Sequence, residues 1–104
     1  MDVTFKTNKL SNRYEIFADG VLAGFEDYTI GDSKISLTHT EILPAFVKVG
    51  LAPQLVTHAL EDARAKGLSV LPLCSYVAKY IRQRPHEYVD LVPEYERRRF
   101  NLQS

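Results

Sequence analysis

The sequence predicts an α/β (α+β) fold: a mixed, mostly antiparallel sheet of about five strands with helices packed on it, in the order ββββαβα. Residues 3–42 alternate in short runs separated by the turn-forming segments NKLSN, DG and GDS, which is typical of hairpins. Beyond residue 52 the apolar residues recur every three or four positions, which is typical of an amphipathic helix.

Length and composition fit one folded domain. The 104 residues are 45% hydrophobic and 25% charged, and 13 basic side chains balance 13 acidic ones. This neutrality argues against nucleic acid or a membrane as an obligatory partner. The start lacks an apolar leader and no stretch approaches the roughly 18 apolar residues of a membrane span, so we expect a cytoplasmic protein. One cysteine and three scattered histidines do not predict a metal site.

Each element has its own signal. Four strands of a meander are expected within 3–42, with Asp19-Gly20 in a tight turn. A helix is predicted over about 53–66, with Pro53 in its first turn and Lys66-Gly67 at its end. The apolar run 68–74 predicts a short strand buried on both faces, and its Pro72 indicates an edge or a splayed pairing. A right-handed crossover makes that strand parallel to the fourth.

A second helix is predicted over 75–84, ending before Pro85. Residues 1–92 form the predicted single domain. The tail, 93–104, is charged and a poor core candidate, so we expect a short docked helix or a frayed end.

The turn at Gly50 points to an anion site. A glycine turn that enters a helix at Ala52-Pro53 exposes the free amides of the first turn and the positive end of the helix dipole. These groups suit a phosphate, and Lys48 could add a charge. Most helices begin in this way with nothing bound, which is the alternative.

Residues 35–92 resemble the compact single-domain branch of the GNAT acetyltransferase superfamily. The matching pieces are HTE on the fourth strand, Gly-x-Ala at the helix start, then ALEDARAKGL, PLC, YIR with a following Pro, and EY-x-DLV. RYEIFADG at 13–20 matches the second strand. The resemblance implies acetyl-CoA as co-substrate and a small-molecule or protein amine as acceptor.

The resemblance also implies where acetyl-CoA binds. In this superfamily the fourth and fifth strands splay, pantetheine lies between them, and the pyrophosphate sits on amides at the start of the next helix. The implied cofactor-binding residues are Ile42, Val47, Lys48, Val49, Gly50, Leu51, Ala52, Pro53, Cys74, Tyr76 and Lys79. Arg82 and Arg84 could reach the ribose phosphate, or simply form a solvated face.

Four departures weaken the match. Val47 stands where the superfamily has Arg or Gln, and Lys48 stands where the branch usually has Gly. Pro53 removes one amide donor from the first turn. His86 looks like a one-residue insertion.

His39 and Glu41 are the first candidates for chemistry, since residues two apart on a strand share a face. His39 could take the proton of an amine, because its ordinary pKa is about 6.5. The alternative is a hydrogen-bonded core histidine, because Ile35 and Leu37 would share that face.

Cys74 and two tyrosines are the other candidates. Cys74 precedes a helix whose dipole can stabilise a thiolate, so it could carry an acetyl group, line the thioester pocket, or be a small buried hydrophobe. Tyr76 or Tyr80 could protonate the leaving thiolate, and packing is the alternative for Tyr80. His58 is expected to have no role, and Arg97-Arg98-Arg99 make a weak nucleic-acid patch.

These observations predict an acetyl-CoA-dependent N-acetyltransferase, acting as a monomer or weak homodimer. The alternative is a degenerate GNAT-fold interaction module that has lost acetyl-CoA binding, which Val47 supports.

Overall fold

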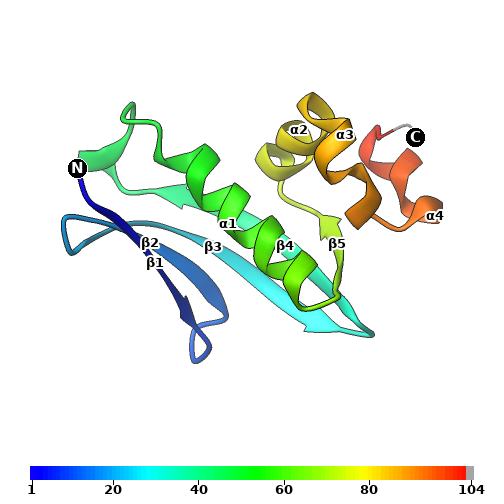
Figure 1. Ribbon diagram of the computed structural model, residues 1–104, viewed down its shortest axis with the longest axis horizontal. Helices are drawn as coiled ribbons and strands as arrows, with labels where there is room; N and C mark the ends of the chain where they lie inside the picture. Colours follow the sequence, from blue (N-terminus) through cyan, green and yellow to red (C-terminus); the bar gives the residue numbers. More distant parts are fainter. Residues whose placement is uncertain (103–104) are drawn as a thin grey trace.

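The computed structural model describes residues 1–102 and confirms the predicted fold class (Figure 1). The strands are β1 (Val3–Asn8), β2 (Arg13–Ala18), β3 (Val21–Gly31), β4 (Lys34–Ile42) and β5 (Ser69–Pro72). The helices are α1 (Leu51–Ala65), α2 (Ser75–Gln83), α3 (Pro85–Tyr88) and α4 (Glu94–Arg97), with 3-10 turns η1 (Pro44–Phe46), η2 (Val89–Leu91) and η3 (Arg98–Phe100).

The sheet has the order β1-β2-β3-β4-β5. The first three pairings are antiparallel, and β4 and β5 pair in parallel from Lys34–Ser69 to Leu37–Pro72. In Figure 1, α1 lies across the sheet and the later helices gather beyond β5. The strand order follows the chain order, so the crossover through α1 brings β5 to the edge next to β4.

Helix α1 starts two residues earlier than its apolar periodicity predicts. Gly50 caps it with a φ of 77°, a left-handed conformation that glycine adopts without a steric penalty. Leu51 is buried and becomes the first residue of the apolar face. At the other end Gly67, at a φ of 68°, donates its amide to the carbonyl of Arg64 and ends the helix.

One face of the sheet packs on α1 to form the core, and the other face stays open. The largest fully buried apolar side chains belong to β2, β4, β5, α1 and α2: Tyr14, Ile16, Ile35, Leu37, Leu51, Leu55, Leu60, Ile81, Val56, Val70 and Val77. Strand β5 buries Val70 and Pro72, but Leu71 is only half-buried. The expectation that β5 is buried on both faces is therefore wrong, because the second face of this edge strand meets solvent.

A β-bulge in β4 changes which side chains share a face. Tyr28 pairs with Leu37 and Asp27 pairs with His39, so Thr38 is an extra residue with no partner on β3. Leu37 is fully buried, whereas the His39 side chain is 55% exposed. The prediction that His39 shares a face with Leu37 is wrong, because strict alternation ends at the bulge.

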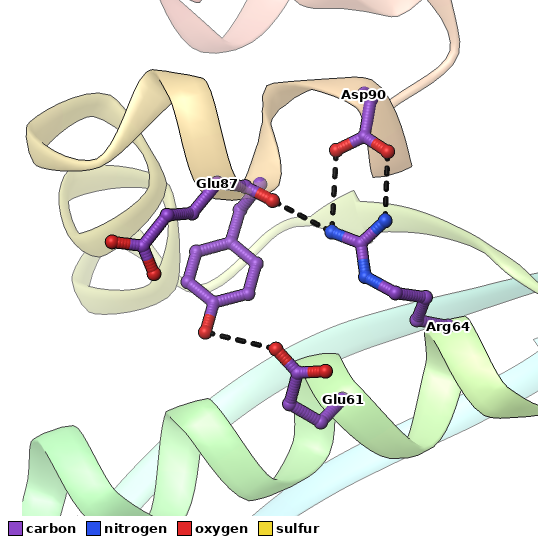
Figure 2. Close-up of polar contacts among 5 residues, drawn as sticks. Glu61, Arg64, Glu87 and Asp90 are labelled. Atoms are coloured by element: carbon purple, nitrogen blue, oxygen red, sulfur yellow. Dashed lines mark hydrogen bonds and ion pairs between the residues drawn. The ribbon is translucent and has the colours of Figure 1, made fainter.

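Polar contacts fasten α1 to the segment after α2 (Figure 2). Arg64 donates to both carboxylate oxygens of Asp90, at 2.8 and 3.3 Å, and to the carbonyl of Glu87 at 2.6 Å. The Tyr88 hydroxyl donates to Glu61 at 3.1 Å. Burial and the neighbouring Glu61 carboxylate raise the pKa of Tyr88 to about 12, so the phenol keeps its proton. These contacts hold α3 and η2 against α1.

The tail contributes more to the core than its composition suggests. Residues 94–100 form α4 and η3, and Leu102 is 2% exposed within the core cluster. The expectation of a poor core candidate is therefore wrong for Leu102, since a single apolar side chain after a charged run gives little sequence signal. Gln103 and Ser104 lie outside the described residues.

Candidate active site

The site begins where β4 and β5 part. Their ladder ends at the Leu37–Pro72 pair, and the amide of Cys74 then donates to the carbonyl of Leu37 at 2.8 Å. Strand β4 continues to Ile42, whereas the segment that follows β5 turns away into α2. Within residues 1–102, the stretch Thr38–Ile42 therefore has no β5 partner along this edge. Its backbone groups can bind an extended ligand.

A groove of about 290 Å³ lies next to the open edge of β4, at the start of α1. Its lining consists of Ile42, Phe46, Val47, Lys48, Gly50, Leu51, Ala52 and Pro53. No side chain caps the first turn of α1, and Gln54 instead donates its side-chain amide to the Gly50 carbonyl at 3.2 Å. The amides of Leu51 and Ala52 and the positive end of the helix dipole therefore suit an anion.

Seven of the residues implied by the resemblance line this groove together, and Val49 is the member of the loop that does not. Phe46 was missed, because its place in a turn before the loop gives no sequence signal. Lys48 adopts a φ of 74°, a left-handed conformation that favours glycine. This conformation explains why the compact branch usually has glycine at this position.

Tyr76 and Lys79 lie elsewhere. They line a second cleft of about 590 Å³ between α2 and the tail, together with Arg82 and Arg99. Arg82 is occupied there, because it donates to the carbonyls of Phe100 and Asn101. The groove and this cleft share no lining residue, so the structure does not bring the whole predicted set together.

His39 and Glu41 lie on the open face of the sheet. Their side chains form a hydrogen bond of 2.8 Å between Nε2 and Oε1, and both are exposed to solvent. The Phe25 ring lies 6.4 Å from the His39 ring. The buried core histidine considered as an alternative is excluded by this exposure. An amine that approaches the open face can reach the imidazole.

Cys74 lies on the other side of the sheet, at the N-cap of α2. It is part-buried, and its Sγ is 3.3 Å from the Thr40 hydroxyl. That hydroxyl also donates a hydrogen bond to the fully buried Glu26. Sequence reasoning missed Thr40, because the bulge that turns it inward leaves no signature in the residue pattern. It also missed Glu26, although Glu26 alternates regularly with the buried Gly24 and Tyr28 of β3.

Tyr80 and His58 both have packing contacts. The Tyr80 hydroxyl bonds to Thr57 of α1, and the Arg84 guanidinium lies 4.0 Å above its ring. These contacts favour the packing interpretation of Tyr80. His58 stacks on Phe5 of β1 at 4.3 Å, and partial burial lowers its pKa.

Residues 1–102 lack two further features. No group of three or more His, Cys, Asp or Glu side chains is placed to hold a metal ion. None of the helices described combines the length and apolar character needed to cross a membrane.

Comparison with known proteins identifies the family. The family model for the GCN5-related N-acetyltransferases matches residues 13–91. The chain belongs to this family. A GCN5-like protein from Staphylococcus aureus has the same fold, with a TM-score of 0.62 and 22% identity, over 86% of this chain and 87% of that one.

A second solved structure is similar over a shorter stretch. It is the PaiA N-acetyltransferase from Thermoplasma acidophilum in complex with coenzyme A, with a TM-score of 0.49 and 24% identity. The match covers 65% of this chain and 38% of that one. No curated protein matches the chain.

Proposed function

We propose that this GCN5-related chain is an acetyl-CoA-dependent N-acetyltransferase that transfers the acetyl group to an amine. The observation that carries the proposal is the groove at the start of α1, where uncapped helix amides lie next to the open edge of β4. The helix amides can bind a pyrophosphate, and the open strand edge can bind an extended pantetheine arm.

The binding roles follow from this geometry. The amides of Leu51 and Ala52 hold the pyrophosphate, and the unpaired edge of β4 over Thr38–Ile42 holds the pantetheine amides. Val47 supplies no donor, so Lys48 is the cation of the loop. The loop therefore binds phosphate mainly through backbone groups.

The chemical roles divide between the two faces of the sheet. His39, held by Glu41, takes the proton of the attacking amine on the open face. Cys74 lies on the donor side, where it is placed to accept the acetyl group before the amine does. In that step the Cys74 thiolate attacks the thioester carbonyl, the carbon–sulfur bond of acetyl-CoA breaks, and the CoA thiolate leaves and takes up a proton from water. The amine then attacks the acetyl carbon, the bond to Cys74 Sγ breaks to return the thiolate, and the amine proton passes to His39.

Calorimetric titration with acetyl-CoA, followed by intact-mass measurement, tests the proposal. We expect saturable binding and an added acetyl group that is absent in Cys74→Ala. Binding and turnover that persist in Cys74→Ala without an adduct would leave direct transfer as the mechanism. If no binding is observed at millimolar acetyl-CoA, the enzyme proposal is rejected in favour of an interaction module, the alternative that Val47 supports.

Ala52→Glu tests the groove itself. The new carboxylate would face the pyrophosphate, and we expect affinity for acetyl-CoA to fall about 100-fold or more. The same charge favours the helix dipole at this end, so the protein should not become less stable. Ala65→Glu, the same change at the exposed far end of α1, is the control and should bind normally.

A further inference from the structure

Three side chains from three elements meet beside the candidate site. Glu26 of β3 lies opposite Thr40 of β4 in the strand register, and the Thr40 hydroxyl donates to Glu26 Oε1. The same hydroxyl lies 3.3 Å from Cys74 Sγ, and either atom can donate in that contact. Thr40 therefore links a buried carboxyl to the thiol by hydrogen bonds.

Glu26 is unusual for a carboxyl group in a protein core. Its side chain is completely buried, and Oε2 has no hydrogen-bond partner among the described residues. Burial raises the pKa of Glu26 to about 8, with a smaller contribution from Asp27, against the opposing effect of the Thr40 hydrogen bond. Glu26 therefore holds a proton at pH values where an ordinary glutamate is ionised.

Other ionisable groups near this cluster have partners of their own or point away from it. Tyr14 of β2, the cross-strand neighbour of Glu26, donates to Asp62 of α1. Asp62 also pairs with Lys66. On the same face, Tyr28 packs its ring 5.0 Å from the Tyr14 ring. Other nearby groups are Asp27, His39 and Glu41 on the other face of the sheet, His58 stacked on Phe5, Tyr80 bonded to Thr57, and Tyr76 and Lys79 in the cleft beyond α2.

We propose that Glu26 and Cys74 form a proton-sharing pair bridged by the Thr40 hydroxyl, in which the buried carboxyl holds the proton that leaves the thiol. Once the pair has lost one of its two protons, Cys74 passes the remaining proton to Thr40 Oγ while Thr40 passes its own to Glu26 Oε1. The thiol becomes a thiolate, the carboxylate becomes a carboxylic acid, and the net charge of the cluster does not change. Glu26 is thus a positioning residue for the thiol.

Sharing has a measurable consequence, because two coupled groups titrate as a pair. One proton leaves the pair before the other, and the resulting negative charge is divided between Glu26 and Cys74. The second proton leaves only at higher pH, since like charges repel. Reactivity of the Cys74 thiolate should therefore rise in two steps with a flat region between them.

The experiment is alkylation of the free protein by iodoacetamide from pH 6 to pH 10, followed by intact mass. Cys74 is the single cysteine, so the signal has one source. We expect two steps in the wild type and one step in Glu26→Gln. At pH 9 the Glu26→Gln variant should react about threefold faster or more, because the neighbouring charge is gone. Coincident single-step profiles would overturn the proposal.

Variants of Thr40 separate sharing from repulsion across space. Thr40→Val removes the bridge, and we expect loss of the first step and about tenfold slower alkylation at pH 7.5, because the thiolate loses its donor. Thr40→Ser should restore both steps. A Thr40→Val profile that keeps two steps would overturn the proposal. Glu15→Gln, which changes a buried carboxyl on the opposite face, is the matched control and should keep the wild-type profile.

The proposal extends the proposed acetyl transfer, because Cys74 is the acetyl acceptor in that scheme. The two can fail separately. Two-step alkylation without acetyl-CoA binding would support the proton-sharing pair and reject the enzyme. Acetyl-CoA binding with single-step alkylation would support the enzyme and reject the pair.

Discussion

Glu15 and Glu26 lie on adjacent strands and are both buried, yet their environments are opposite. Glu15 is on the face away from α1, where Arg13 donates to its carboxylate at 2.8 Å and Asn8 at 3.1 Å. Burial acts to raise the pKa of Glu15, but these hydrogen bonds and the Arg13 charge outweigh it and hold that pKa below its ordinary value. Within residues 1–102, Glu26 has the Thr40 hydroxyl as its side-chain donor, a backbone hydrogen bond from His39 and no paired cation, and its pKa is raised to about 8.

The comparison shows that partners, and not burial alone, decide whether a carboxyl is ionised inside this sheet. It also gives the two residues opposite effects on stability. Glu15 stabilises the fold as a carboxylate, whereas Glu26 does so as a carboxylic acid.

The largest expected effect concerns Glu26. Its pKa in the folded protein, about 8, lies above the ordinary value of 4.5, so the folded state keeps a proton that the unfolded chain loses. The stability that this proton provides is therefore lost as pH rises through 8. Between pH 5 and pH 9 we expect the free energy of unfolding to fall by up to about 4 kcal/mol. Urea unfolding at several pH values measures it.

Glu26→Gln should remove most of that loss, because the amide does not ionise. Glu15→Gln is the control and should keep the alkaline decline. Equal slopes for the wild type and Glu26→Gln would show that Glu26 ionises normally and would cancel the contrast between the two residues.

The next effect concerns Arg13. Arg13→Ala leaves the buried Glu15 carboxylate with Asn8 as its remaining side-chain donor, and it removes the guanidinium that lies 4.4 Å above the Phe25 ring. We expect about 2 kcal/mol lower stability at pH 7. The Glu15 contribution is lost as pH falls through its lowered pKa, so the variant should also show a flatter acid limb. Unchanged stability would mean that Asn8 alone satisfies Glu15.

The smallest effect concerns Asp27, whose charge helps to raise the pKa of Glu26. Asp27→Asn should lower the pKa of Glu26 by less than about one unit, because burial is the larger cause. Carboxyl carbon shifts in a pH titration by NMR measure this value directly. Glu15 serves as the internal control, and its pKa should be the same in the wild type and in Asp27→Asn.

Sequence periodicity was sufficient for the architecture. The apolar face of α1, the turn at Asp19-Gly20 and the parallel edge strand all follow from local pattern. The Gly50 loop was located because a glycine turn and a helix start are local features too. Those parts of the site that depend on one segment were therefore predictable.

The residue-by-residue alignment of β3 with β4 could not be predicted from the sequence. A bulge depends on how two strands align, so the sequence around Thr38 did not reveal that His39 turns outward and Thr40 inward. The link from Glu26 to Cys74 joins residues that are 48 positions apart, and no spacing rule connects them.

The bulge at Thr38 bears on two kinds of mutation, substitution and deletion. The side chain of Thr38 is exposed and donates a hydrogen bond to the Asp27 carbonyl at 3.2 Å, so most replacements at this position should be tolerated. Deleting the residue removes the bulge, and His39 then follows Leu37 directly, so strict alternation still places His39 outward and Thr40 inward. The extra residue therefore adds length to β4 between two paired positions, and the sides on which the site residues lie do not depend on its presence.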